Sequence, residues 1–256
     1  MLEVTSLTKR FGGLLAVNRV DFQLRQGEIL GMIGPNGAGK TTVFNMITGI
    51  YRPDTGSIRL DGRELVGLKP HDITAMGIAR TFQTIRLFPN LTVMENVMAG
   101  QFCRTRAGVW DAICRSRRHC QEERSILAEA ERQIDFMGLS HLAEELARNL
   151  PYGLQRRLEI ARALATHPQL LVLDEPAGGL NDQETRELMR SVEEIRDSGI
   201  TVFLIEHDMT VVMGICERII VLDNGEKIAE GTPREIQAHP RVIEAYLGRE
   251  EEESHG

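Results

Sequence analysis

One stretch of this 256-residue sequence decides its fold: Gly34-Pro35-Asn36-Gly37-Ala38-Gly39-Lys40-Thr41. Glycines at this spacing let backbone N–H groups curl around a phosphate chain. A largely apolar run, Glu28 to Ile33, precedes the stretch and predicts a short strand. Apolar residues then recur at helical spacing, at Val43, Met46, Ile47 and Ile50. The sequence therefore predicts a strand, a phosphate-binding loop and a helix whose positive dipole end adds to phosphate binding.

The side chains that close this loop predict a site for a nucleotide and Mg²⁺. Lys40 is expected to reach the β- and γ-phosphates as a point charge, and the Thr41 hydroxyl to bind Mg²⁺. We expect the loop from Gly34 to Thr42 to contact the nucleotide throughout. The alternative is a merely flexible glycine loop, which does not explain the flanking strand and amphipathic helix.

A pair of carboxylates follows a second apolar run. Leu170-Leu171-Val172-Leu173 predicts a buried strand that delivers Asp174 and Glu175 to the edge where open α/β sheets bind ligands. Asp174 would hold Mg²⁺ through water. Glu175 would act as the general base for the attacking water, a role worth about 10²–10⁴ in rate. Without the phosphate loop, a solvated turn would be the better interpretation.

The order of patterns predicts an α/β fold with a P-loop NTPase-like core, a mixed sheet flanked by helices. An antiparallel β-subdomain is expected from Leu2 to Leu65, with a hairpin at Asp61-Gly62. A helical subdomain, about 84–165, is inserted in this core. We predict one domain over 1–248 and an acidic, disordered tail over 249–256.

Composition excludes several classes of function. The net charge of −7 argues against a nucleic-acid binder, whose Lys and Arg residues usually gather on one face. No run of roughly 20 apolar residues would span a bilayer, and the first residues do not resemble a signal peptide. Cys103, Cys114, Cys120 and Cys216 show no metal-binding spacing and are expected to be reduced thiols.

Further motifs in the chain resemble the ATP-binding-cassette ATPases. Gln83, Leu150-Pro151-Tyr152-Gly153-Leu154, Asp174-Glu175 and His207 follow in that family's order, and the resemblance covers nearly the whole chain. Within the family, the sequence is similar to branched-chain amino acid transporter ATPases of the LivG type. The segments that carry this similarity are Arg10 to Val17, Arg80 to Gln83, Gln155 to Arg162, Ile205 to Met209 and Val242 to Gly248.

The resemblance implies roles for three more residues. Phe11 follows the first strand, where these ATPases place an aromatic side chain that stacks on adenine, whereas a β-region Phe is otherwise a core residue. Gln83 matches the glutamine that contacts Mg²⁺ or its water and joins the sheet domain to the helical lobe. His207 would hydrogen-bond the γ-phosphate or the attacking water. The alternative is a surface histidine beside Glu206.

The resemblance also implies a composite site between two chains. Tyr152-Gly153-Leu154 would begin a helix and contact the γ-phosphate held by a second ATPase subunit in a head-to-tail dimer. Apolar residues at helical spacing support this helix, with Arg156 and Arg157 on its polar side. The segment departs from the usual Leu-Ser-Gly-Gly-Gln because Pro151 replaces the serine and Leu154 the glutamine. We expect the contact with the opposing phosphate to be weakened but not abolished.

Two further expectations concern neighbouring subunits. Asn181 stands where many relatives carry aspartate in the loop after Glu175, which bears on communication between the two sites. The apolar residues around Gln83 would form a groove for a membrane subunit, although they could equally be core. They are Ile85, Leu87, Phe88 and Leu91.

Together these patterns indicate the ATP-hydrolysing subunit of an importer, which couples Mg-ATP binding and hydrolysis to uptake of branched-chain or related amino acids. The implied partners are membrane permease subunits, a second ATPase subunit in a homodimer or heterodimer, and indirectly a periplasmic or extracellular substrate-binding protein. We expect the chain to lie peripherally on the cytoplasmic face of the inner (plasma) membrane. The alternatives are a lipopolysaccharide-export ATPase, a soluble cassette ATPase acting on nucleic acid, and a P-loop phosphotransferase, which would leave His207 unexplained.

Overall fold

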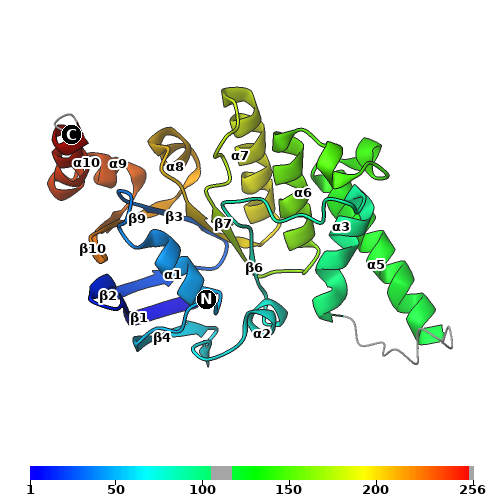
Figure 1. Cartoon of the computed structure of the whole chain (residues 1–256), viewed down its shortest axis with the longest axis horizontal. Helices are drawn as coiled ribbons and strands as arrows, with labels where there is room; N and C mark the ends of the chain where they lie inside the picture. Colours follow the sequence, from blue (N-terminus) through cyan, green and yellow to red (C-terminus); the bar gives the residue numbers. More distant parts are fainter. Residues whose placement is uncertain (105–116, 254–256) are drawn as a thin grey trace.

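A six-stranded mixed sheet forms the centre of the computed structural model, which describes residues 1–104 and 117–253 (Figure 1). Its strand order is β10-β9-β3-β8-β7-β6, and only the β9–β10 pair is antiparallel. The strands are β3 (Ile29–Ile33), β6 (Ile78–Arg80), β7 (Leu170–Asp174), β8 (Thr201–Ile205), β9 (Arg218–Asp223) and β10 (Glu226–Gly231). The expected mixed sheet is therefore confirmed.

A second, antiparallel sheet of order β2-β1-β4-β5 packs beside the first. Its strands are β1 (Leu2–Phe11), β2 (Leu14–Leu24), β4 (Thr55–Leu60) and β5 (Arg63–Glu64). Asp61 and Gly62 join β4 to β5 with φ of 49° and 77°, the left-handed conformation that a tight hairpin turn requires. The predicted hairpin is confirmed.

Helix α1 (Lys40–Ile47) lies between the two sheets, and its Phe44 ring packs 4.6 Å from that of Phe203 in β8. Successive residues of the parallel strands face opposite sides, as the two-residue period of a strand requires. In β7, Leu170 and Val172 join the core around α1, whereas Leu171 and Leu173 join a second core with helices on the other face of the sheet. The sheet is thus buried on both faces, which explains why its strands are almost wholly apolar.

A helical lobe follows β6 and precedes β7, as expected, and lies at the opposite end of the molecule from the C-terminus (Figure 1). It contains α3 (Val93–Gly100), η1 (Gln101–Arg104), α5 (Arg117–Phe136), η2 (Ser140–Leu142), η3 (Ala147–Asn149) and α6 (Tyr152–Leu164). Residues 105–116 of the expected lobe lie outside the described residues. Helices α3 and α6 touch at Gly100, where an added Cβ would lie 2.3 Å from the Arg162 carbonyl oxygen.

The remaining helices cover the sheet and its edge. They are α2 (Pro70–Ala75), α7 (Asp182–Asp197), α8 (Met209–Ile215), α9 (Pro233–Gln237) and α10 (Pro240–Glu253). Helix α10 runs into the segment 249–256 for which the sequence predicted disorder, because glutamates are good helix formers and extend a helix that is already seated. Residues 254–256 lie outside the described residues.

Two smaller findings concern membranes and cysteines. Among the described helices, none combines the length and the apolar character needed to cross a membrane. Cys216 is a buried free thiol, as expected. Cys114 lies outside the described residues, and the side chains of Cys103 and Cys120 are likewise not described.

Candidate functional site

The loop between β3 and α1 owes its shape to three glycines. Gly34, Gly37 and Gly39 have φ of 150°, 79° and 100°, a region that other residues rarely enter. A Cβ on Gly34 would lie 2.0 Å from the Leu222 carbonyl oxygen, and one on Gly39 would lie 2.5 Å from that of Ala16. Apart from its neighbours in the chain, Gly37 has no atom of the described residues within 4 Å of an added Cβ. Two glycines are therefore needed for close packing, and the third faces an open space.

Lys40 lies at the start of α1, with only 7% of its surface exposed. Its Nζ donates to the carbonyl oxygens of Gly34 (2.6 Å) and Pro35 (3.0 Å). The ammonium group is thus held inside the curl of the loop. Thr41, next in the chain, is exposed, and its hydroxyl is open to a ligand.

A cavity of about 520 Å³ opens over this loop. The predicted site residues that line it are Phe11, Asn36, Gly37, Ala38, Gly39, Lys40, Thr41, Thr42, Gln83 and Glu175. Four lining residues were not foreseen, namely Leu14, Leu15, Ala16 and Asn224. The first three belong to the start of β2, shortly after Phe11, so their closeness to Phe11 in the sequence could have predicted their place in the cavity. Gly34 and Pro35 form the buried base of the loop.

Phe11 lines the cavity and is not a core residue, since 41% of its surface is exposed. Its ring meets Tyr51 edge to face, with 5.2 Å between the centroids. Lys9 Nζ lies 5.5 Å from the centre of the same ring. An exposed, braced aromatic face beside the phosphate loop is suited to stacking on a base.

Three residues that follow separate strands meet at Glu175, which lines the cavity together with Gln83, whereas His207 does not line it. Gln83 Nε2 donates to Glu175 Oε2 at 2.9 Å, and His207 Nδ1 lies 3.8 Å from the same oxygen. The Glu175 N–H donates to the Ile205 carbonyl at 2.9 Å, which ties the ends of β7 and β8 together. The structure therefore brings Gln83, Glu175 and His207 to one carboxylate oxygen.

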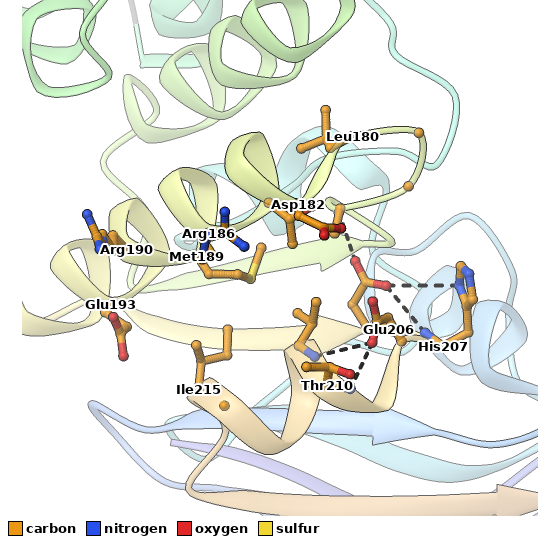
Figure 2. Close-up of a pocket in the computed structure, with 17 residues that line it drawn as sticks. Leu180, Asp182, Arg186, Met189, Arg190, Glu193, Glu206, His207, Thr210 and Ile215 are labelled. Carbon is orange, nitrogen blue, oxygen red and sulfur yellow. Dashed lines mark hydrogen bonds and ion pairs between the residues drawn. The ribbon is translucent and has the colours of Figure 1, made fainter.

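Glu206 positions the loop that carries His207. It is 1% exposed, and its carboxylate accepts from the N–H of Ala177 (2.8 Å) and of His207 (3.3 Å). Burial raises the pKa of the Glu206 carboxyl, and the Ala177 N–H opposes this effect. Figure 2 shows Glu206 and His207 at one end of a separate pocket between α7 and α8. His207 itself is largely exposed, but it faces Glu175 as well as Glu206.

Asp174 makes an ion pair that sequence reasoning missed. Its Oδ2 accepts from Arg80 Nη2 at 2.6 Å, and both side chains are buried. Arg80 also donates to Asn45 Oδ1 of α1 (2.7 Å) and to Oγ1 of Thr48, the C-cap of that helix (3.1 Å). Within the described residues, Asp174 Oδ1 has no hydrogen-bond partner. The signal in the sequence was Arg80 itself, because a charged residue that ends a short strand next to apolar residues needs a partner of opposite charge.

The segment Tyr152-Gly153-Leu154 lies apart from the cavity of the same chain, since none of the three is among the described residues that line it. Helix α6 begins here after Pro151, its N-cap, which makes no side-chain hydrogen bond. Tyr152 is 45% exposed. Asn181 caps α7, where its Oδ1 accepts from the N–H groups of Gln183 and Glu184, a task that an aspartate performs equally well.

Arg156 contradicts the prediction that it lies on the polar side of α6. Its side chain is 1% exposed and forms a 3.0 Å ion pair with Glu159, which is equally buried. The prediction was wrong because helical periodicity assigns charged residues to solvent and does not reveal that a neighbour on the same helix, here Glu159, is buried with the arginine. Burial raises the pKa of the Glu159 carboxyl, against the effects of the Arg86 N–H and the Arg156 guanidinium. Arg157, in contrast, is partly exposed as expected.

Comparison with known proteins agrees with this geometry. Residues 17–178 match the ABC transporter family. The chain belongs to that family. A second match covers residues 226–252 and is described as branched-chain amino acid ATP-binding cassette transporter. The ABC transporter match spans the phosphate loop, Gln83, the segment at the start of α6 and Asp174-Glu175. As a family member the chain is an ATPase that binds ATP.

Individual relatives match along almost the whole chain. The high-affinity branched-chain amino acid transport ATP-binding protein LivG of Salmonella typhimurium is 48% identical over 97% of this chain and 98% of its own length. A crystal structure of the ADP conformation of an ATP-binding cassette of an ABC transporter is 31% identical, with a TM-score of 0.85 over 97% of this chain and 98% of that one. A dimeric bacterial ABC transporter cassette is 28% identical, with a TM-score of 0.78 over 91% and 99%.

Proposed function

We propose that this chain is the ATP-hydrolysing subunit of an importer for branched-chain amino acids. Two matches support the substrate class, one along almost the whole chain and one over its C-terminal residues. LivG is 48% identical along nearly the full length, and residues 226–252 match the family specific to branched-chain amino acid transporters. The general cassette alone would leave the substrate open, since the site itself recognises only nucleotide.

ATP would bind in the cavity over the phosphate loop. Phe11 would stack on adenine, braced by Tyr51. The N–H groups from Gly37 onward, together with the N-terminal end of α1, would surround the β- and γ-phosphates. The Lys40 ammonium now donates to the neutral carbonyl oxygens of the loop. It would leave them and pair with the phosphate oxygens, because charged acceptors form stronger hydrogen bonds with an ammonium group.

The donor set also fits Mg²⁺, an ion that prefers oxygen ligands and keeps several waters. Thr41 offers an exposed hydroxyl, Gln83 an amide oxygen in the cavity, and Asp174 a buried oxygen without a hydrogen bond among the described residues. These three residues would hold the ion directly or through water. When bound, Mg²⁺ neutralises charge on the phosphates.

Hydrolysis would be directed by the three groups that meet at Glu175 Oε2. That carboxylate would accept a proton from water, the water oxygen would bond to the γ-phosphorus, and the bond to the β,γ-bridging oxygen would break to leave ADP and phosphate. Gln83 and His207 are within reach of the same water because both already approach Glu175 Oε2. Their part is to orient the water and stabilise charge on the γ-phosphate.

The site would be completed by a second ATPase subunit. Tyr152-Gly153-Leu154 is separate from the cavity of its own chain, so these residues are available to the γ-phosphate of a partner in a head-to-tail dimer. A similar cassette has been solved as a dimer, which supports this arrangement. The partner would be either a second copy or a sister ATPase.

The segment after Gln83 would receive a cytoplasmic helix of a permease subunit, and the chain would then lie peripherally on the cytoplasmic face of the membrane. Phe88 is 50% exposed, whereas Ile85, Leu87 and Leu91 are half-buried and support it. The buried Asn96 fixes this turn by donating to the carbonyls of Phe88, Leu91 and Thr92 and accepting from the Phe88 N–H. A substrate-binding protein would act on the permease and not on this chain.

The experiment that tests the proposal is purification of the tagged chain from membranes, followed by reconstitution of the complex in proteoliposomes. We expect two permease chains to co-purify and ATP to drive uptake of radiolabelled leucine, isoleucine or valine. Glu175→Gln provides the control, because it should assemble the same complex without uptake. Co-purification with lipopolysaccharide-export subunits or with nucleic acid would contradict the proposal.

A further inference from the structure

We propose that Arg156 and Glu159 of α6 act as positioning residues that lock the Gln83 loop, residues 81–86, to the helix that presents Tyr152-Gly153-Leu154. We call this pair the α6 clamp. It deepens the proposed function, on which it rests, because it joins the group that touches Glu175 to the segment that reaches the partner's phosphate. Four contacts of the clamp to the loop and one to Tyr152 carry the proposal.

The clamp forms hydrogen bonds with both the N–H groups and the carbonyl oxygens of the Gln83 loop. Glu159 Oε1 accepts from the N–H of Phe82 (3.4 Å) and of Arg86 (3.2 Å). Arg156 donates to the carbonyl oxygens of Phe82 (2.7 Å) and Gln83 (2.9 Å). Donors and acceptors of the loop are thus matched by one acidic and one basic side chain, more than 70 residues away in sequence.

The same guanidinium also reaches the segment at the start of α6. Arg156 Nη2 donates to the Tyr152 hydroxyl at 3.2 Å, so one nitrogen serves both Tyr152 and the Gln83 carbonyl. The Tyr152 ring in turn packs on the loop after Glu175, where a Cβ on Gly179 would lie 3.1 Å from Tyr152 Cε1. A displacement of Tyr152 therefore reaches the Gln83 backbone through one side chain.

Stability alone does not account for this pair. Taking two charges out of water costs free energy that their attraction often fails to recover, and apolar replacements of such pairs are frequently neutral or stabilising. Both side chains are only 1% exposed, and Arg156 is the largest fully buried side chain among the described residues. An apolar pair at these positions would lose the hydrogen bonds to the Gln83 loop. The planar guanidinium of Arg156 donates its hydrogen bonds in a fixed geometry that a lysine side chain lacks.

Substitutions in the clamp should lower turnover and leave ATP binding intact. Arg156→Lys keeps the charge but loses the forked geometry, and Glu159→Gln keeps an acceptor oxygen but places an amide against Arg156. For each we expect kcat to fall about 10-fold, with the dissociation constant for an ATP analogue within about twofold of the parent. Arg157→Lys is the matched control, because Arg157 sits one residue along α6 in a partly exposed ion pair with Glu187. Its kcat should stay within about twofold.

A double-mutant cycle with Gln83→Ala separates positioning from a merely structural effect. If the clamp acts through Gln83, Arg156→Lys changes kcat less than about twofold once Gln83 is gone, since coupled residues are not additive. Losses that multiply in Gln83→Ala/Arg156→Lys, or an unchanged kcat in both clamp variants, overturn the clamp and leave the proposed function standing. An unchanged kcat in Gln83→Ala alone overturns both the clamp and the proposed role of Gln83.

Discussion

The phosphate loop and the segment at the start of α6 both stand at a helix N-terminus, the first proposed for the chain's own ATP and the second for the ATP of a partner, yet they are fixed in different ways. The loop is held by its own backbone, because Gly34 and Gly39 pack against carbonyls of β9 and β2. The α6 segment has an N-cap, Pro151, without a side-chain hydrogen bond, and is anchored instead by the buried Arg156 one turn further on. A site shaped by close backbone packing should be damaged by substitutions that add atoms to its glycines. A site held by a side chain should be damaged by substitutions that remove that side chain.

The largest expected effect comes from removing the Glu175 carboxylate, which lines the cavity over the phosphate loop. Glu175→Gln should lower kcat about 10²- to 10⁴-fold, because an amide cannot accept the proton of the attacking water. ATP binding should persist, and the ATP-bound dimer should accumulate, since both phosphate contacts remain. Steady-state hydrolysis and gel filtration with ATP measure the two effects. Unchanged hydrolysis would falsify the assignment of Glu175.

A pair of glycine variants tests the backbone side of the comparison. Gly34→Ala should destabilise the fold by at least about 3 kcal/mol, because strain at positive φ adds to overlap with the Leu222 carbonyl. Gly37→Ala is the matched control and should cost only about 1 kcal/mol, since its Cβ meets open space. Urea unfolding measures both. Equal losses in the two variants would show that close packing does not define the loop.

Adding a cap tests the side-chain side of the comparison. Pro151→Ser should raise ATPase activity or ATP-driven dimerisation about two- to fivefold, because serine supplies a hydroxyl and a better N-cap for α6. The change is read from steady-state hydrolysis and from the ATP concentration that gives half-maximal dimer. A lower or unchanged value would mean that no hydroxyl is missing from this segment.

The smallest effect is expected for the stability of the protein when Asp54, the ion-pair partner of Lys9 near Phe11, is replaced. The Arg10 backbone N–H and Lys9 hold the pKa of Asp54 below its ordinary value of 3.8. A depressed pKa gives stability that is present above pH 3.8 and is lost as the pH falls through the folded-state pKa. Asp54→Asn should therefore lower the melting temperature by at most about 2 °C at pH 7, with no difference in strong acid. A difference that persists in strong acid would contradict this origin.

Local patterns in the sequence were enough to predict the phosphate loop, the Asp61-Gly62 hairpin and the strand before Asp174. Each depends on neighbours in sequence, such as glycine conformation or two-residue periodicity. Arg156 and Arg80 were misassigned or missed because their partners are remote. Arg156 bonds to the Phe82 carbonyl 74 positions away, and Arg80 bonds to Asp174 94 positions away. Helical periodicity treats an arginine as solvent-facing and so excludes the buried ion pair in advance.

The contact between Gly100 and the Arg162 carbonyl has a mechanical consequence. Because a Cβ on Gly100 would overlap the Arg162 carbonyl, any larger residue there would push α3 and α6 apart, and such close packing resists sliding of one helix along the other. The exposed Phe88 lies a few residues before α3, and Tyr152 is the first residue of α6. If a permease subunit docks near Phe88 as proposed, a movement of α3 would be shared by α6, and Gly100 would be the close joint between the two helices.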